Sequence, residues 1–72
     1  MIDEKMKKII YQNIEVKTDS ENLEEFLSGK NLLGKKSIIE INNIILQKGM
    51  DYKKIKINNN DIINIFLIVS GG

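Results

Sequence analysis

The 72-residue sequence contains no cysteine, histidine, arginine, proline, alanine or tryptophan. Without Cys the chain has no disulfide, no thiolate nucleophile and no sulfur ligand for zinc. Without His it also lacks the commonest general base and metal ligand. These absences exclude most small-enzyme and zinc-finger functions, so we expect neither a catalytic side chain, nor a metal site, nor a bound cofactor.

An excess of charge of one sign is also lacking. Eleven Lys against ten Asp and Glu leave a net charge of +1, too little to create the field that holds a polyanion, and a nucleic-acid partner is not expected. The most apolar run, residues 62–69, is far shorter than the roughly 20 residues of a membrane-spanning helix, and residues 1–6 do not resemble a signal peptide. We therefore expect no membrane partner and a cytoplasmic location.

The residues that are present describe one small globular domain. Hydrophobic residues make up 42% of the chain and charged residues 29%, which is typical of a protein with a core. A chain of this length buries only about 60% of its unfolded surface, so its stability should be modest. Fifteen Ile and nine Asn indicate an AT-rich coding sequence, and the choice of Lys over Arg or Asn over Gly therefore carries little functional information.

The first part of the chain predicts a β-hairpin followed by a helix. Residues 7–11 are β-prone and residues 14–18 alternate apolar with polar, while Gln12-Asn13 between them suits a tight turn. A helical period follows, with apolar residues at i, i+3 and i+4 that form one face, namely Leu23, Phe26 and Leu27.

The ends of this helix are marked by capping residues. Asn22 and Glu25 have the spacing of a capping box, with Ser20 as a competing cap. Gly29, with Lys30 after it, is a suitable carboxyl-terminal stop. The single apolar stripe predicts a helix that packs on one sheet.

The second part of the chain predicts three more strands. These are residues 37–41, residues 44–46 after a turn at Asn42-Asn43, and residues 62–69. Four apolar residues are expected to pin the intervening connection to the core: Met50, Tyr52, Ile55 and Ile57. The loop 58–61 is rich in residues that tolerate left-handed backbone.

A hairpin, one helix, two strands and a final strand favour an α+β fold of the β-grasp (ubiquitin-like) type. In that fold a mixed four- to five-stranded sheet packs on one main helix, and the last strand lies parallel to the first at the sheet centre. We expect residues 1–5 to be a loose amino-terminal tail, 6–69 the domain and 70–72 a flexible carboxyl-terminal tail.

The sequence ends in Gly71-Gly72 directly after the last predicted strand. A terminal Gly-Gly pair occurs about once in 200 chains by chance, and a cut in a linker or a cloning remnant is the simplest explanation. The alternative is functional, because two glycines form an arm without side chains that can enter a narrow channel. ATP-dependent adenylation would then activate the Gly72 carboxylate toward a sulfur or amine nucleophile.

From about residue 6 to residue 72 the chain resembles the thiamine-biosynthesis sulfur carriers, the ThiS family of β-grasp proteins. The resemblance rests on four segments: 6–10 for the opening strand, 22–27 for the helix start, 39–48 for the V-x-V-N-G-x-x-V-P-R stretch and 60–72 for the closing G-D-x-V-E-I segment with its Gly-Gly end. Gln47, Lys48 and Asn60 stand where the family usually has Pro, Arg and Gly. Asn60 can take the left-handed conformation of that Gly.

The resemblance implies a cycle of modification at the carboxyl terminus. A ThiF-type adenylating enzyme would use ATP and Mg²⁺ to activate Gly72, and sulfur relayed from a cysteine desulfurase would give a thiocarboxylate. Thiazole synthase (ThiG-type) would receive that sulfur. The carrier itself would not be an enzyme; Gly72 would bear the modification, while Ser70 and Gly71 would form the tail.

The alternation in residues 62–69 assigns Ile63, Ile65, Leu67 and Val69 to one face and Ile62, Asn64, Phe66 and Ile68 to the other. Because Ile63 and Ile65 match core positions of the family, Phe66 and Ile68 are candidates for an exposed apolar patch that an activating enzyme binds. A covering loop or a dimer partner is an equally good explanation.

Three other functions remain open on the sequence. The small subunit of molybdopterin synthase is also a β-grasp protein with a terminal Gly-Gly, although it is usually longer and often carries Pro-Pro where this chain has Leu67-Ile68. A ubiquitin-like conjugation tag would use the same tail. A non-catalytic β-grasp interaction domain would make the Gly-Gly incidental.

Overall fold

The computed structural model describes residues 6–69, which form five strands, one α-helix and one short 3₁₀ helix. In chain order they are β1 (Lys7–Tyr11), β2 (Ile14–Thr18), α1 (Leu23–Gly29), β3 (Ser37–Ile41), β4 (Ile44–Ile45), η1 (Tyr52–Lys54) and β5 (Ile62–Leu67). The tails expected at residues 1–5 and 70–72 lie outside the described residues.

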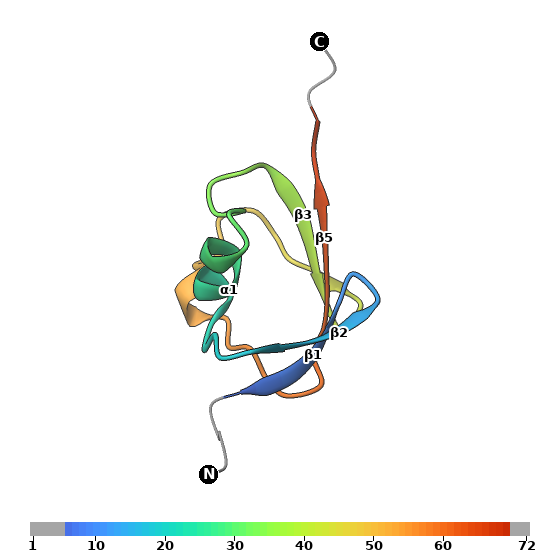
Figure 1. The fold of residues 1–72 in the computed structure, drawn as a ribbon. Coiled ribbons are helices and arrows are strands. Elements are labelled where there is room, and N and C mark those ends of the chain that lie inside the picture. Colours follow the sequence, from blue (N-terminus) through green and yellow to red (C-terminus); the bar gives the residue numbers. More distant parts are fainter. Residues whose placement is uncertain (1–5, 70–72) are drawn as a thin grey trace.

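The five strands form one mixed sheet in the order β2-β1-β5-β3-β4, with β5 at its centre. β5 runs parallel to β1 and antiparallel to β3, and α1 covers one side of the curved sheet (Figure 1). The expected β-grasp fold, with its first and last strands parallel at the centre, is thereby confirmed.

Both hairpin turns adopt left-handed backbone without glycine. Gln12 and Asn13 have φ of 52° and 68°, and Asn42 and Asn43 have φ of 53° and 69°. Two successive positive φ values characterise the type I′ turn, whose twist matches that of the flanking strands. The sequence predicted both turns because Asn is the side chain that best tolerates this conformation.

The amino terminus of α1 is capped by Asn22, as predicted. The Asn22 side chain accepts a hydrogen bond from the Glu25 amide at 2.9 Å, which satisfies one free donor of the first turn. The Glu25 carboxylate reaches one residue further back than in a standard capping box and accepts from the Glu21 amide at 3.0 Å. Ser20 is not the cap.

The carboxyl terminus of α1 falls at Gly29, but the left-handed residue that closes it is Asn31, with φ of 59°. The Leu32 amide donates to the Leu27 carbonyl at 2.8 Å, and the Asn31 amide donates to the Ser28 carbonyl at 3.1 Å. This pair of bonds is the Schellman motif, with Asn31 in the position that Gly usually occupies. Gly29 is therefore the last helical residue and not the residue that turns the chain.

The core lies between α1 and the sheet and consists of eight apolar residues that are at most 4% exposed: Ile9, Leu23, Phe26, Leu27, Ile39, Ile57, Ile63 and Ile65. Tyr52 and Ile55 pack against this cluster, as expected. Met50, however, is 45% exposed, so the prediction that it pins the connection to the core was wrong. Leu46, four residues before Met50, is instead partly buried against the core.

A buried carboxylate fixes the start of β5. Asp61 is 7% exposed and accepts from the Asn42 side chain at 2.9 Å and from the Asn58 amide at 2.7 Å. The side-chain oxygen of Asn42 (Oδ1) in turn accepts from the Ile62 amide at 2.9 Å. These bonds join the loop before β5 to the turn between β3 and β4, and they set the register from which β5 begins.

Between residues 6 and 69, no helix is long and apolar enough to cross a membrane.

Candidate functional site

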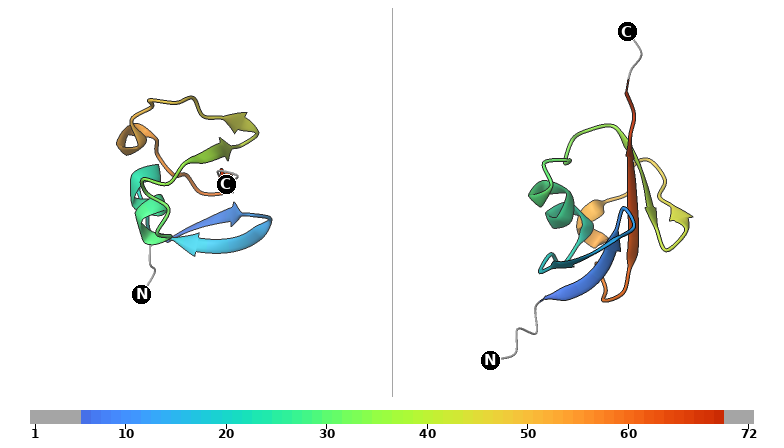
Figure 2. Two further views of the ribbon diagram at one scale, coloured as in Figure 1. Left: turned by 90° about the horizontal axis from the view of Figure 1, so that it is seen from above. Right: turned by 45° about the vertical axis from the view of Figure 1, so that its right-hand side comes forward.

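The candidate site is the carboxyl end of β5, where the strand leaves the body of the sheet. Figures 1 and 2 show this end extending past α1 and past the residues that lead into β3. β5 pairs with β3 from Ile63 to Leu67, but it pairs with β1 only at Ile62 and Ile63. The far half of the strand is therefore held mainly on one side.

Exposure changes abruptly along β5. Ile63 is fully buried and Ile65 is 4% exposed, whereas Leu67 and Val69, two and four residues further on, are 51% and 85% exposed. The sequence pattern assigned all four to one face and matched only Ile63 and Ile65 to core positions, and these two are the buried ones. Alternation fixes which side of the sheet a residue faces, but the core ends before Leu67, so its side chain has little to pack against.

The side of the sheet opposite α1 carries an apolar patch near this end, which we call the outer patch and define as Ile38, Phe66 and Ile68. Phe66 lies directly opposite Ile38 in the β3–β5 ladder, and Ile68 continues the same side of the strand. Their exposed fractions are 43% for Ile38, 54% for Phe66 and 52% for Ile68. Apolar side chains grouped on one surface in this way are typical of a protein-binding site.

The outer patch has a polar neighbour on the side away from the carboxyl end. The Asn64 side chain donates to the Glu40 carboxylate at 3.0 Å, and the two residues are paired across β3 and β5. This bond holds the Glu40 charge beside Asn64 and gives the patch a defined polar border. Protein interfaces commonly combine an apolar centre with a polar, solvent-accessible rim.

Gln12 braces the last well-buried residue of β5. Its side-chain amide donates to the Ile65 carbonyl at 2.8 Å, and its carbonyl oxygen accepts from the Ile65 amide at 2.9 Å. The side chain thus replaces the backbone of a neighbouring strand at the point where β1 has ended. Beyond it, the next residues of β5 have only β3 beside them.

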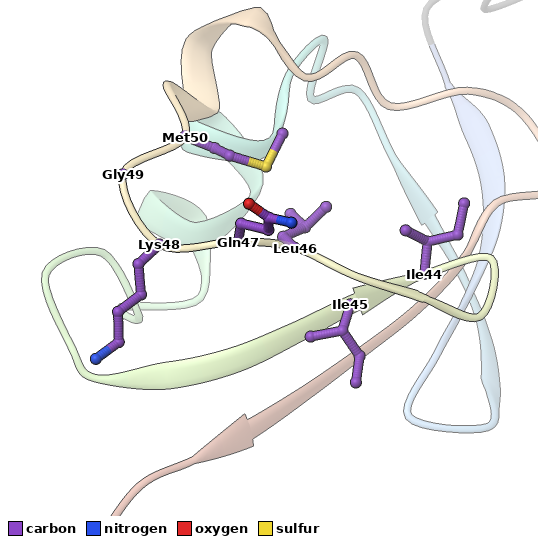
Figure 3. Close-up of a pocket in the computed structure, with 7 residues that line it drawn as sticks. All are labelled: Ile44, Ile45, Leu46, Gln47, Lys48, Gly49 and Met50. Atoms are coloured by element: carbon purple, nitrogen blue, oxygen red, sulfur yellow. The ribbon is translucent and has the colours of Figure 1, made fainter.

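The segment that follows β4 encloses a shallow hollow lined by residues 44–50 (Figure 3). The side chains of Ile44 and Ile45 point in different directions, and Lys48 reaches toward the start of β3. Ile44, Ile45 and Met50 are 67%, 62% and 45% exposed. The lining is mainly apolar, and its one charged side chain is Lys48.

Residues 6–69 contain no group of three or more acidic side chains that could hold a metal ion. Within the same range, no buried side-chain nitrogen or oxygen lacks a hydrogen-bond partner. A polar atom left unsatisfied would have marked a ligand site, because burying one without a partner is costly.

A five-stranded mixed sheet wrapped around one helix, with parallel first and last strands at its centre, defines a β-grasp protein of the ubiquitin-like class. Within that class, the model of the ThiS family matches residues 4–72, and the chain belongs to this family. ThiS-family proteins are small sulfur carriers rather than catalysts, and they act with adenylating and sulfur-transfer enzymes. No curated protein and no solved structure matches the chain.

The predicted site residues divide into two groups. Phe66 and Ile68 lie on the surface at the end of β5. Their exposure shows that no loop among residues 6–69 covers them. Ser70, Gly71 and Gly72 lie outside the described residues, so their roles stay predictions. Sequence reasoning missed Ile38 and Gln12, because only the strand register brings them to β5.

Proposed function

We propose that this protein is the sulfur carrier of thiazole formation in thiamine biosynthesis, with the Gly72 carboxylate as its reactive group. The observation that carries the proposal is the ThiS-family match over residues 4–72, which includes the Gly71-Gly72 end. The described domain supports it, since residues 6–69 form the β-grasp fold of the family and expose apolar side chains beside the end that leads to Gly71-Gly72. The proposed location is the cytoplasm.

The chemistry takes place at one carbon atom. In the active site of a ThiF-type enzyme with Mg²⁺, an oxygen of the Gly72 carboxylate attacks the α-phosphorus of ATP, and pyrophosphate leaves. Hydrosulfide, the simplest sulfur donor, then attacks the acyl carbon of the adenylate. AMP leaves and carries away the carboxylate oxygen that had attacked the α-phosphorus. The product is a thiocarboxylate. In the cell a cysteine desulfurase supplies the sulfur, and thiazole synthase of the ThiG type receives it.

The outer patch is the surface proposed to bind the activating enzyme. Ile38, Phe66 and Ile68 are each about half exposed. Phe66 and Ile68 lie in the segment that leads to the Gly-Gly end, and Ile38 lies beside them on β3. An aromatic residue flanked by aliphatic ones is the typical centre of a protein interface, where a few side chains carry most of the binding energy. Gly71 and Ser70 would provide the reach from this surface to the nucleotide.

The deciding experiment is an intact-mass measurement. The protein is incubated with ATP, Mg²⁺, sulfide and the ThiF-type enzyme of the organism that encodes it. We expect the mass to rise by the difference between sulfur and oxygen. A variant that lacks Gly72 should remain unchanged, and so should a variant with an extra Ser after Gly72. Equal modification of these variants, or no modification of the wild type, would refute the proposal.

Two further arms of the experiment test the surface and the pathway. Phe66→Ala should lower kcat/KM for the carrier in ATP–pyrophosphate exchange by roughly 10- to 100-fold. Ile14→Ala, which removes a similarly exposed residue on β2, should leave kcat/KM unchanged. The thiocarboxylated protein is then offered to thiazole synthase and to the large subunit of molybdopterin synthase. Sulfur transfer to the second enzyme alone would assign the carrier to molybdopterin.

A further inference from the structure

Two adjoining clefts flank the last described residues of the chain, and lysines line both. Lys35 and Lys36, just before β3, line each cleft together with Ile68. Lys48 and Tyr52 also line one of the two clefts. We call Lys35, Lys36 and Lys48 the lysine rim.

The backbone holds the rim in place around the end of β5. The Lys36 carbonyl accepts from the Ile68 amide at 3.0 Å, which extends the β3–β5 ladder one pair beyond the assigned strands. The Lys35 amide donates to the Leu32 carbonyl at 3.1 Å in the turn before it. Lys48 precedes Gly49, whose φ of 85° turns the chain, and the Lys48 side chain reaches toward the start of β3 (Figure 3).

Among residues 6–69, no carboxylate lines either cleft. The two nearest acidic residues along the chain are both engaged: Glu40 accepts from Asn64, and Asp51 accepts from the Lys53 amide at 3.0 Å. The chain as a whole is nearly neutral, with a net charge of +1, so three lysines around clefts whose described lining has no acidic side chain are a local feature of this end. Acidic side chains on a binding partner would complement them.

The position of the rim indicates which molecule that is. It adjoins the outer patch, since Ile68 belongs both to the patch and to the two clefts. A protein that binds Phe66 and Ile68 and takes in the residues that follow them must pass over the rim. Of the two surfaces, the apolar one supplies affinity and the charged one supplies orientation and speed of association.

We propose that the lysine rim docks against carboxylates on the ThiF-type adenylating enzyme, at the edge of the surface that receives the outer patch. This inference rests on the proposed function. The rim pairs with the partner's acidic side chains during encounter and orients the end of β5 toward the active site. The rim touches no reacting atom, so it governs productive binding and not the chemical step.

The test is a charge-reversal series measured by ATP–pyrophosphate exchange with the ThiF-type enzyme. Reversal of all three charges (Lys35→Glu, Lys36→Glu and Lys48→Glu) should lower kcat/KM for the carrier by roughly 100-fold, while kcat at saturating carrier is retained. Replacement of the same three residues by Arg should leave kcat/KM close to that of the wild type. Added salt should lower kcat/KM markedly for the wild type and much less for the charge-reversed variant.

A matched control carries the same change in net charge elsewhere. Lys17→Glu, Lys54→Glu and Lys56→Glu together alter exposed residues that line neither cleft, and their kcat/KM should stay near that of the wild type. Thermal unfolding of each variant checks that the fold is intact. If the two reversed variants lose kcat/KM equally, or if the rim variant loses none while the wild type is thiocarboxylated, the rim inference falls and the carrier function stands. A wild type that is never modified overturns both.

Discussion

Residues 62–65 and residues 66–69, the two halves of β5 when the two residues after the strand are included, are both mainly apolar but have opposite environments. In the first half Ile63 and Ile65 lie in the core beneath α1, and in the second half Phe66 and every residue after it up to Val69 is at least 51% exposed. The first half is paired on both sides, whereas the second has β3 on one side only. The comparison teaches that apolar residues of the strand form the core where α1 covers the sheet, and that apolar residues at its far end lie exposed on both sides of the sheet.

The strongest test of this comparison is to truncate one residue of each half and compare the losses of stability. Ile63→Ala should lower the free energy of unfolding by about 2–5 kcal/mol, because it leaves a cavity in a fully buried site. Domains of this size are only about 5–15 kcal/mol stable, so part of the population should unfold. Ile68→Ala should cost less than about 1 kcal/mol. Urea denaturation measures both.

Should Ile63→Ala fail to fold, Ile63→Val keeps the comparison measurable, with an expected loss of about 0.5–1.5 kcal/mol. Equal losses at positions 63 and 68 would show that the second half of β5 also contributes to the core, contrary to its exposure.

The junction between the two halves is tested at Gln12. Gln12→Met keeps the length of the side chain but removes both hydrogen bonds to Ile65, and it should lower stability by about 1–2 kcal/mol. The left-handed backbone at position 12 is the same in both proteins, so the difference reports the lost bonds. Amide hydrogen exchange should accelerate at Ile65. Unchanged exchange at Ile65 would mean that the Gln12 side chain does not brace the strand.

The smallest effect is expected at Val69, which shares a face with Ile63 by alternation but is 85% exposed. Val69→Ser should change the free energy of unfolding by less than about 0.5 kcal/mol in a urea titration. A substantially larger loss would indicate that the core continues to the last described residue.

Most of the fold was predictable because local chemistry marks its boundaries. Asn13 and Asn43 accept positive φ, so the sequence located both type I′ turns and with them the strands on either side. Asn22 was identified as the helix cap from its spacing to Glu25. The order of the elements along the chain then favoured the β-grasp arrangement, with the last strand parallel to the first at the sheet centre.

The errors arise where the outcome depends on distant parts of the chain. Alternation placed Leu67 on the core side but carries no information on where the core ends. The bond between Gln12 and Ile65 spans 53 residues of sequence and leaves no local signal. The role of Asn31 as the left-handed residue that ends α1 did have a local signal in the sequence. Leu32 after it is the apolar residue that a Schellman motif places against the helix.

The placement of β5 between an antiparallel and a parallel neighbour has a mechanical consequence. A pull applied at the Val69 end acts along the strand axis, so it shears the β3–β5 ladder and loads its five paired positions together. The same pull on an edge hairpin would open its hydrogen bonds one after another. The domain is therefore built to resist tension at the end by which we propose it is gripped, and an enzyme can draw that end into a channel without unravelling the protein behind it.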